Sequence, residues 1–340
     1  MITLKNCFIL PGVPKLLIQT FEVIKKSHLG HTSKHKTTVE ECFIVTDEFA
    51  ITDKLNSLVS KYQDCQFGSY PQWTHNYYQT KITVESPQKS TVAKVVKEIN
   101  ETMETITFDN QPTESAMEKI VKLLEGCEDS SFVEQVKAAQ KVIEECFQTY
   151  NENQVALAFN GGKDCMVLLH LTHAYLQSQG SSRKLQAVYI ADKEPFDSVE
   201  EFIEKCRAMY NLDLMTLQGP MKEALSKMLQ DRPEIQATLM GTRRGDPGAK
   251  NLKYFSATDG DWPKLMRVNP ILEWEYANVW KFLRGLTLPY PDLYDKGYTS
   301  LGGKSNTVPN PNLALKDGKF QPAFKLEDGN LERAGRGKRA

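Results

Sequence analysis

Apolar residues in the second half of the chain follow two alternating patterns. Short continuous apolar runs of strand length are separated by longer stretches in which apolar residues recur at helical spacing. These patterns predict strands at 154–159, 185–190, 212–217 and 235–240, and helices at 163–177, 198–210 and 221–230. Strands that alternate with helices are typical of a parallel sheet covered on both faces. We therefore predict an α/β fold that binds its ligands beyond the carboxyl ends of the strands.

The first half predicts a smaller α/β unit followed by a connecting segment. The expected strands are 7–10, 40–45 and 78–84, and the expected helices are 16–24, 51–62 and 91–103. Turn-forming residues and one short helical pattern predict a linker at 106–130. A further amphipathic helix at 132–147 is expected to pack on the sheet of the second half. The predicted domains are therefore 1–105 and 131–340.

Polar residues mark where several of these helices are expected to begin. A Ser, Thr, Asp or Asn side chain at the N-cap accepts a hydrogen bond from a free N–H group of the first turn. The expected N-caps are Thr52 or Asp53 for the helix at 51–62, and Ser130 or Ser131 for the helix at 132–147. Asp197 and Glu200, three residues apart, predict a capping box at the start of the helix at 198–210.

A pair of glycines joins the first strand of the second half to the helix that follows it, in the sequence Asn160-Gly161-Gly162-Lys163-Asp164-Cys165. The N-terminus of a helix carries about half a positive charge and leaves N–H groups free, so this turn is a candidate anion site. Glycine allows a phosphate to approach the main chain closely. Lys163 adds a positive charge, and Asp164 is the expected Mg²⁺ ligand. The alternative is a plain βα turn, since G-x-x-x-x-G-K-[ST] and G-x-G-x-x-G are both absent. The strand before and the helix after favour the anion site.

The stretch 159–165 resembles the modified pyrophosphate loop of the eukaryotic-type FAD synthases, which are FMN adenylyltransferases of the PAPS-reductase-like superfamily. The wider superfamily usually has Ser-Gly-Gly-x-Asp-Ser, so Asn160 and Cys165 indicate the FAD synthase branch. Later segments resemble this family in the same order: 241–247 (Gly-x-Arg-x-x-Asp-Pro), 258–263 (Thr-Asp-x-x-Trp-Pro), 288–303, 309–313 and 331–336 (Glu-Arg-Ala-Gly-Arg). The resemblance runs from about residue 150 to the C-terminus and implies a Rossmann-like, parallel-sheet nucleotide α-hydrolase fold.

The resemblance also implies a reaction and the residues that carry it. FMN and MgATP would give FAD and pyrophosphate, with Mg²⁺ bound at Asp164. The implied roles are Asn160 and Asp164 at the phosphates; Gly161, Gly162 and Lys163 around pyrophosphate; main-chain groups near Leu157, Ile190 and Thr242 at adenine and ribose; Arg243 in the flavin and nucleotide segment; Asp246, Asp259, Gly260, Asp261 and Trp262 on the flavin side; and Arg333 with Arg336 closing over phosphates from one side of a helical turn.

The first 105 residues are similar to the second half of a molybdopterin-binding-like domain. The matching stretches are Leu10-Pro11-Gly12-Val13-Pro14 and Gly68-Ser69-Tyr70-Pro71. The first half of such a domain, with its glycine-rich loop, is missing from the sequence. Two interpretations stay open, a working pterin or hydrolase site and a truncated structural module, and we favour the module. An incomplete domain leaves sheet edges and apolar faces uncovered, so we expect docking to the second domain or to another subunit.

Charge, cysteine and histidine usage exclude several function classes. The net charge of −1 gives no argument for nucleic acid or a membrane surface. No apolar run approaches the ~18 residues of a membrane span, and the N-terminal residues resemble neither a signal nor a transit peptide. The 7 scattered cysteines predict reduced thiols and a cytoplasmic protein, without a zinc ribbon. His28, His31 and His35 form a candidate metal face, although a solvated polar loop is favoured.

Two alternatives to an FAD synthase remain from the residues. A PAPS reductase or an adenylating thiolase uses the same loop, but the reductase needs a nucleophilic cysteine near its C-terminus and no cysteine follows Cys206. A non-catalytic flavin or pterin carrier would bind FMN without releasing pyrophosphate. Cys165 itself is expected to be a small buried helix residue rather than a nucleophile. The expected partners are FMN and ATP, with self-association or client apo-flavoproteins left open.

Overall fold

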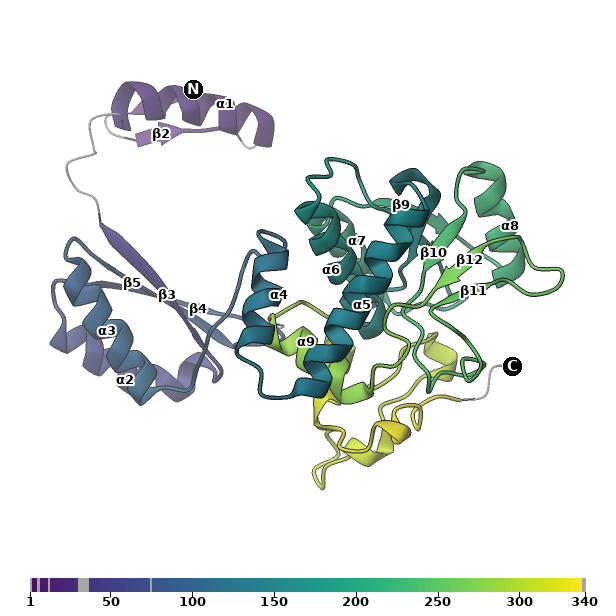
Figure 1. The fold of residues 1–340 in the computed structure, drawn as a ribbon. Coiled ribbons are helices and arrows are strands. Elements are labelled where there is room, and N and C mark those ends of the chain that lie inside the picture. The colour runs from purple at the N-terminus through teal and green to yellow at the C-terminus, as the bar shows by residue number, and fades with distance from the viewer. Residues whose placement is uncertain (1, 5–6, 12, 30–36, 74, 338–340) are drawn as a thin grey trace. The chain divides into compact units, whose positions relative to one another are not determined.

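The computed structural model describes residues 2–4, 7–11, 13–29, 37–73 and 75–337. The chain divides into two compact units, Met1–Thr107 and Phe108–Ala340, and both combine helices with a β-sheet (Figure 1). The segment 106–130, expected as a linker, therefore belongs almost entirely to the second unit. Of the candidate metal face, His31 and His35 lie outside the described residues.

The first unit contains a four-stranded antiparallel sheet with the strand order β4-β5-β3-β6. Its elements are β3 (Thr38–Ile44), α2 (Glu48–Lys61), β4 (Gln66–Pro71), β5 (Thr80–Ser86), α3 (Lys89–Thr102) and β6 (Thr105–Ile106). Alternate residues of β5 are buried, and Ile82 and Val84 pack against apolar side chains from both helices. Both helices consequently cover the same face of the sheet (Figure 1). Ahead of them come β1 (Ile2–Leu4) paired with β2 (Cys7–Ile9), α1 (Pro14–Ile24) and the π-helical turn Lys25–Leu29.

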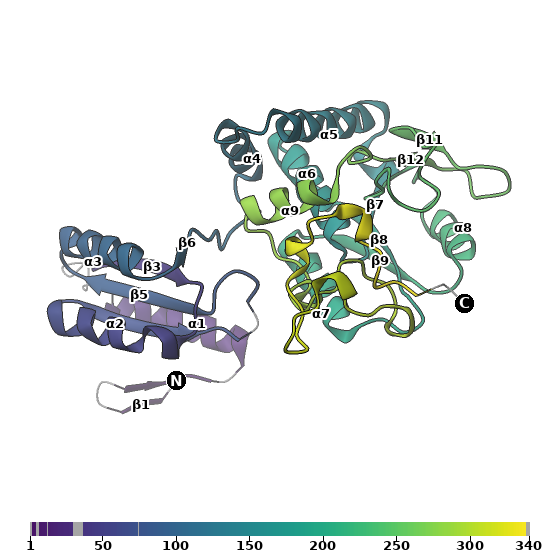
Figure 2. The same cartoon turned by 90° about the horizontal axis from the view of Figure 1, so that it is seen from below.

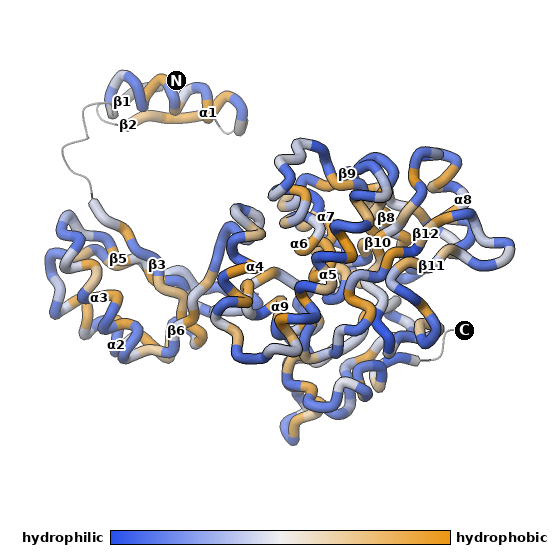
Figure 3. Tube along the Cα trace, viewed as in Figure 1, coloured by the Kyte–Doolittle hydropathy of each residue, from blue (hydrophilic) through white to orange (hydrophobic). Residues whose placement is uncertain are grey.

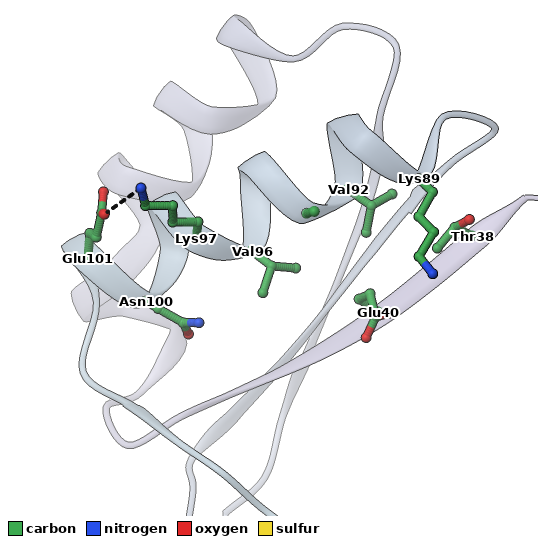
Figure 4. A pocket seen from close by; sticks show the side chains of 9 residues that line it. Thr38, Glu40, Lys89, Val92, Val96, Lys97, Asn100 and Glu101 are labelled. Atoms are coloured by element: carbon green, nitrogen blue, oxygen red, sulfur yellow. Dashed lines mark ion pairs between the residues drawn. The ribbon is translucent and has the colours of Figure 1, made fainter.

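An open groove of about 440 Å³ lies between β3 and α3 in this unit (Figure 4). Its lining combines valines with lysines and glutamates: Thr38, Glu40, Lys89, Val92, Ala93, Val96, Lys97, Asn100 and Glu101. Lys97 and Glu101 form an exposed ion pair at 3.7 Å. A groove lined by valines and solvent-exposed charged residues does not indicate pterin binding. The molybdopterin-binding-like description of this unit therefore stays a prediction.

The second unit contains a six-stranded sheet with the order β11-β12-β10-β7-β8-β9. The strands are β7 (Val155–Ala158), β8 (Gln186–Ile190), β9 (Asp213–Leu217), β10 (Ala237–Leu239), β11 (Phe255–Ala257) and β12 (Met266–Val268). All neighbours are parallel except β11, which is antiparallel to β12. The predicted mostly parallel α/β sheet is confirmed, and β11 and β12 are strands that the sequence patterns missed.

Helices cover both faces of this sheet. They are α4 (Ala116–Glu125), α5 (Ser130–Thr149), α6 (Lys163–Ser178), α7 (Asp197–Met209), α8 (Met221–Asp231) and α9 (Tyr276–Gly285). Helix α6 is central to one layer and contacts α4, α5 and α9, whereas α8 packs on the face that carries Ala156 and Val188 (Figure 2). Hydrophobic residues gather in α6 and around β8 and β10, between these layers (Figure 3).

Three predicted helix caps are wrong, because a nearby aspartate or a longer helix takes the cap position. Helix α2 begins at Glu48, and Asp47 accepts a hydrogen bond from the Ala50 N–H group at 2.9 Å. Asp129, rather than Ser130 or Ser131, caps α5 through the Phe132 N–H group at 3.1 Å. Helix α7 already includes Asp197, so the capping box does not form. The Glu200 carboxylate instead accepts a hydrogen bond from the Tyr189 hydroxyl.

The chain after α9 contains short 3₁₀ turns rather than longer helices. These are Asp292–Tyr294, Lys304–Asn306, Pro311–Leu313, Ala323–Lys325 and Gly329–Leu331, and a similar turn at Glu152–Gln154 precedes β7. In the described part of the chain, no helix has the length and apolar character that crossing a membrane requires.

Candidate active site

Two loops leave the sheet side by side where the strand order reverses. From β7 the chain continues to β8 and β9, and then returns through α8 to β10 on the other side of β7. Because β7 and β10 pair in parallel, the loops that follow them, 159–162 and 240–246, begin at neighbouring carboxyl ends. Open α/β sheets bind ligands at such a point.

The loop after β7 is a tight glycine turn. Gly161 has a φ of +73°, a left-handed conformation that glycine adopts without steric strain. A Cβ atom at this position would lie 3.0 Å from Ile203 Cγ1 of helix α7. Asn160 is exposed, and its Oδ1 accepts a hydrogen bond from the Gly162 N–H group at 3.0 Å. The turn therefore needs glycine at position 161 and holds the Asn160 side chain over the start of α6.

Some N–H groups at this helix start are bonded within the protein. The main-chain N–H group of Lys163 donates to the Tyr294 hydroxyl at 3.0 Å. Together with the bond from Gly162 to Asn160, this uses two of the groups that the sequence analysis expected to be free for a phosphate. Fewer N–H groups are therefore open to an anion here than at a helix N-terminus without such bonds.

The Lys163 side chain points into the protein. Lys163 is 1% exposed, and its Nζ lies 3.1 Å from Asp164 Oδ2 and 3.2 Å from the Thr299 carbonyl oxygen, which accepts a hydrogen bond. It also forms an ion pair with Glu332 Oε1. Sequence analysis expected Lys163 to hold pyrophosphate, whereas the structure gives it three partners inside the protein.

Four buried or half-buried charges form a closed ring. Arg243 Nε lies 2.7 Å from Asp164 Oδ1, and the other end of the guanidinium pairs with Glu332 Oε2. Asp164 and Glu332 thus each bridge the same two cations, Lys163 and Arg243. We call Lys163, Asp164, Arg243 and Glu332 the charge ring. Two positive and two negative groups give it no net charge.

Mutual attraction keeps Lys163, Asp164 and Arg243 ionised despite burial. Burial acts to lower the pKa of Lys163, but Asp164 and Glu332 outweigh burial and raise it. Burial acts to raise the pKa of Asp164, but Lys163 and Arg243 outweigh it and hold this pKa below its usual range. Lys163 Nζ also lies 5.3 Å from the ring centre of Tyr276 and 5.8 Å from that of Tyr294. The aromatic rings exclude water from one side of the ammonium group.

The other polar residues of the loop after β10 have different roles. Asp246 Oδ2 accepts a hydrogen bond from the main-chain N–H group of Arg243 at 2.9 Å. Burial and the nearby Asp164 raise the pKa of Asp246. Arg244 turns away: it pairs with Glu273 and donates to the carbonyl oxygens of Ala249, Lys250 and Leu252 at 3.2, 3.0 and 2.7 Å. Arg244 therefore shapes the segment after the loop, and Arg243 is the arginine at the site.

The carboxyl-terminal residues reach the site as a series of turns, so the helical turn predicted for Arg333 and Arg336 is wrong. Glu332 enters the charge ring, and Arg333 beside it is exposed. Arg336 donates to the Leu301 carbonyl oxygen and lies 3.4 Å from Ser300 Oγ. The two arginines therefore differ: Arg333 faces solvent next to the ring, and Arg336 is held by the segment at 300–301.

The predicted flavin residues form the tip of the hairpin between β11 and β12. Asp259 accepts a hydrogen bond from Arg267 at 3.0 Å, and Asp261 pairs with Lys222. Trp262 is 39% exposed, and Gly260, two residues before it, has a φ of +55°. Among the described residues, no hydrogen bond or ion pair links this tip to the charge ring.

The hairpin leaves the sheet at the end opposite to the glycine turn. Ala257 pairs with Met266, and Met266 pairs with Ala237, the first residue of β10. However, Lys222 stands in the first turn of α8, which follows the carboxyl end of β9. The ion pair between Lys222 and Asp261 therefore shows that the loop folds back toward the carboxyl ends of the strands.

The three residues predicted to offer main-chain groups to a nucleotide lie at or near strand ends. Leu157 is buried in β7, Ile190 is the last residue of β8, and Thr242 is half-buried directly before Arg243. They lie on three segments that meet at the carboxyl edge of the sheet, as a site at this edge requires.

Two family profiles match separate parts of the chain. The profile described as phosphoadenosine phosphosulfate reductase domain matches residues 154–228 and 215–309. The profile described as FAD synthase, middle domain, matches residues 36–112. The first match covers the strands and loops of the candidate site, and the second covers most of the first unit.

Sequence relatives show to which family the chain belongs. A probable FAD synthase of Caenorhabditis elegans is 35% identical over 348 aligned positions, which cover 98% of this chain and 67% of the relative. A probable FAD synthase of Schizosaccharomyces pombe is 43% identical over 202 positions, which cover 58% of this chain and 76% of the relative. This chain belongs to the FAD synthase family. It spans about two thirds of the length of the nematode relatives.

Solved structures of the FAD synthase family share the fold of the second unit. The Candida glabrata FMN adenylyltransferase in complex with FAD and inorganic pyrophosphate has a TM-score of 0.63 and 28% identity, covering 66% of this chain and 98% of that one. The yeast FAD synthetase in complex with FAD has a TM-score of 0.61, also at 28% identity, covering 66% and 98%. The predicted family and its PAPS-reductase-like fold are confirmed.

Sequence reasoning missed several residues that build this site in the present member of the FAD synthase family. Glu332, Tyr276, Tyr294 and Thr299 all contact Lys163, and none was predicted as a site residue. The signal for Glu332 was present, because it is the glutamate of the Glu-Arg-Ala-Gly-Arg motif. The tyrosines carry no such signal, since buried aromatic residues near helices usually belong to the core.

The protein side chains do not by themselves form a metal site at Asp164. Both Asp164 oxygens are already paired with cations, one with Arg243 and one with Lys163. In the part of the chain that the structure describes, no group of three His, Cys, Asp or Glu side chains gathers in a way that suits a metal ion. Mg²⁺ prefers one or two carboxylates together with phosphate oxygens and water. The donor set here therefore fits Mg²⁺ that arrives on the nucleotide rather than a resident ion.

Proposed function

We propose that this chain transfers AMP from MgATP to FMN and produces FAD and pyrophosphate, the activity for which its family is named. The observation that carries the proposal is the meeting of three matched segments in one charge ring. Lys163 and Asp164 come from the glycine turn, Arg243 from the loop after β10, and Glu332 from the carboxyl-terminal motif. Sequence relatives of this chain are named FAD synthase, and a solved relative was crystallised with FMN and the ATP analogue AMPCPP.

The chemistry needs positioning more than acid–base catalysis. An oxygen of the FMN 5′-phosphate attacks the α-phosphorus of ATP, a new P–O bond forms, and the bond to the bridging oxygen breaks so that pyrophosphate leaves. The attacking phosphate is already anionic near neutral pH, so no protein base has to remove a proton. The protein must bring two anions together and stabilise the charge that moves onto pyrophosphate.

The positive groups next to the ring are suited to this task. Because the charge ring is neutral, the excess positive charge comes from outside it, and we assign it to Arg333, Arg336 and the Mg²⁺ of MgATP. Asn160 and the glycine turn hold the phosphates, and Leu157, Ile190 and Thr242 offer main-chain groups to adenine and ribose. These roles are supported by the exposure of Asn160 and Arg333 beside buried, fixed neighbours.

The flavin is assigned to the hairpin side of the site. The exposed Trp262 ring offers a stacking face, and the carboxylates of Asp259 and Asp261 accept hydrogen bonds, so this loop suits a heteroaromatic ring with N–H groups. Asp246 is also assigned to the flavin side; it stands in the loop after β10, burial raises its pKa, and its Oδ2 accepts a hydrogen bond from the main-chain N–H group of Arg243. A location in the cytoplasm and delivery to apo-flavoproteins stay predictions.

The experiment is to incubate the purified chain with FMN, ATP and MgCl₂ and to measure FAD and pyrophosphate together. We expect both products in equal amounts, and none when Mg²⁺ is replaced by a chelator. Riboflavin is the matched control, because it has the same ring but lacks the attacking phosphate and should release no pyrophosphate. FMN binding without either product would instead identify a flavin carrier and reject the proposal.

A further inference from the structure

We propose that Glu332 is a positioning residue that locks the carboxyl-terminal turn onto the nucleotide loop and so places Arg333 over the phosphates. In this arrangement Lys163 is the internal partner of Glu332 and does not contact pyrophosphate. The proposal rests on the proposed function. It concerns how the segments of the site are held together. It gives Lys163 the role of holding Glu332 in place of the expected role of binding pyrophosphate.

Lys163 has no donor left for a phosphate. An ammonium group has three N–H donors. In the structure its three acceptors are Asp164 Oδ2, Glu332 Oε1 and the Thr299 carbonyl oxygen. The group is also buried, with an exposed side-chain fraction of 2%. A phosphate could reach Lys163 only after one of these bonds breaks and the aromatic cover opens.

Glu332 joins the two loops of the site to the chain terminus. One of its oxygens pairs with Lys163 in the loop after β7, and the other pairs with Arg243 in the loop after β10. Glu332 is 9% exposed and stands 169 residues after Lys163 in the sequence. A single carboxylate thus fixes three segments that are distant in sequence.

The backbone on both sides of Glu332 is held as well. The Leu331 carbonyl oxygen accepts from Asn310 Nδ2 at 2.8 Å, and the Glu332 carbonyl oxygen accepts from Thr299 Oγ1 at 2.6 Å. Lys163 bonds the Thr299 carbonyl oxygen, so the same ammonium holds both the glutamate and the segment that supports it. Arg333 follows directly, and its carbonyl oxygen accepts from the Arg336 N–H group at 2.9 Å. The main chain at Arg333 is therefore held in place, while the Arg333 side chain is exposed.

The first test compares Glu332→Gln with Glu327→Gln. Glutamine keeps the size of the side chain but removes the charge that holds both cations, so we expect KM for ATP to rise and kcat/KM for ATP to fall by about 10²-fold, as misplacement by about 1 Å does. A purely structural role would lower the amount of folded protein and kcat while KM for ATP stayed unchanged. Glu327 is exposed in the same tail, and its variant should match wild type. Wild-type kinetics of Glu332→Gln would overturn the proposal.

The second test asks whether Glu332 acts through Arg333. If it does, adding Glu332→Gln to Arg333→Ala should cost less than a further 2-fold or so, because the group being positioned is already gone. Independent, multiplying losses would mean that Glu332 acts in another way. FAD formation by wild type separates the two proposals, since its absence would reject the function and leave nothing for Glu332 to position.

The third test concerns Lys163. It also tests the proposal if Glu332→Gln alone does not fold. The double variant Lys163→Met/Glu332→Gln removes one positive and one negative charge, so the remaining Asp164 and Arg243 are again balanced. We expect it to unfold at a higher temperature than Glu332→Gln and to bind ATP at least as well, measured by calorimetry without FMN. A further loss of ATP affinity of about 10-fold, the size of one lost ligand contact, would show that Lys163 touches the nucleotide and would overturn the reassignment.

Discussion

Gly241 lies directly against the main chain of Asp164. A Cβ atom at position 241 would stand 3.0 Å from the Asp164 carbonyl carbon and 3.0 Å from the Cys165 nitrogen. Both atoms belong to the first turn of α6 and cannot move away as a flexible side chain could. The loop after β10 therefore touches the helix start through bare backbone, and this contact brings Arg243 to Asp164.

We expect Gly241→Ala to separate the two loops of the site. The added methyl group meets backbone, so overpacking should cost about 1–3 kcal/mol in the free energy of unfolding. It should also raise KM for ATP, since Arg243 is moved away from Asp164. Gly245→Ala is the matched control from the same loop, because its Cβ would have open space. Thermal unfolding and steady-state kinetics of both variants check this; equal behaviour of the two would contradict the close contact.

Much of the fold follows from local patterns, whereas the orientation of Lys163 does not. The strands β7 to β10 lie in mostly apolar runs of strand length, which the sequence displays directly. Strands β11 and β12 have only 3 residues each and lie among polar and charged residues, so no apolar run of strand length marks them. Lys163 points inward because Glu332 and Thr299 meet it there, and both lie more than a hundred residues away in sequence. A motif identifies the lysine, but only the assembled fold decides which way it points.

A methyl group should destabilise the protein more at Gly161, in the glycine turn, than at Gly180, which follows α6. Gly161 and Gly180 have nearly the same φ, +73° and +71°. Gly161→Ala combines the left-handed backbone cost of about 1–2 kcal/mol with contacts to Ile203 and Val199 at 3.0 and 3.3 Å. Gly180→Ala has the backbone cost alone, since its Cβ would meet nothing within 4 Å. Urea unfolding should rank Gly161→Ala as the less stable variant, and it alone should slow FAD formation.

Asp164→Asn should reduce FAD formation by about 10²-fold, because Arg243 and Lys163 lose the carboxylate that positions them, and misplacement by about 1 Å costs about that much. The change also leaves the charge ring with one unbalanced cation, which should cost about 3–5 kcal/mol, as for one half of a buried pair. Asp197→Asn is the control: its side chain is 88% exposed and 3.1 Å from Lys304, so its loss should cost about 0–1 kcal/mol. FAD formation near the wild-type rate by Asp164→Asn would remove Asp164 from the site.

Acid should destabilise the second unit through His170. His170 is buried in α6, its Nδ1 lies 3.0 Å from the Tyr210 hydroxyl, and burial lowers its pKa to about 3. In the unfolded chain the same group has a pKa of about 6.5. The unfolded state therefore binds a proton first as the pH falls. The stability that neutral His170 contributes is complete above pH 6.5 and is lost between pH 6.5 and 3, at about 1.4 kcal/mol per pH unit.

Urea unfolding at pH 7.0, 6.0 and 5.0 measures this dependence, with His170→Phe as the comparison. Phenylalanine keeps an aromatic ring next to Phe282 but cannot bind a proton. The variant loses the bond to Tyr210, so its stability at pH 7.0 should be lower than that of wild type. Its decline with pH should be shallower, and the remaining slope should come mainly from His173, whose pKa burial also lowers. Identical slopes for the two proteins would mean that folding does not lower the pKa of His170.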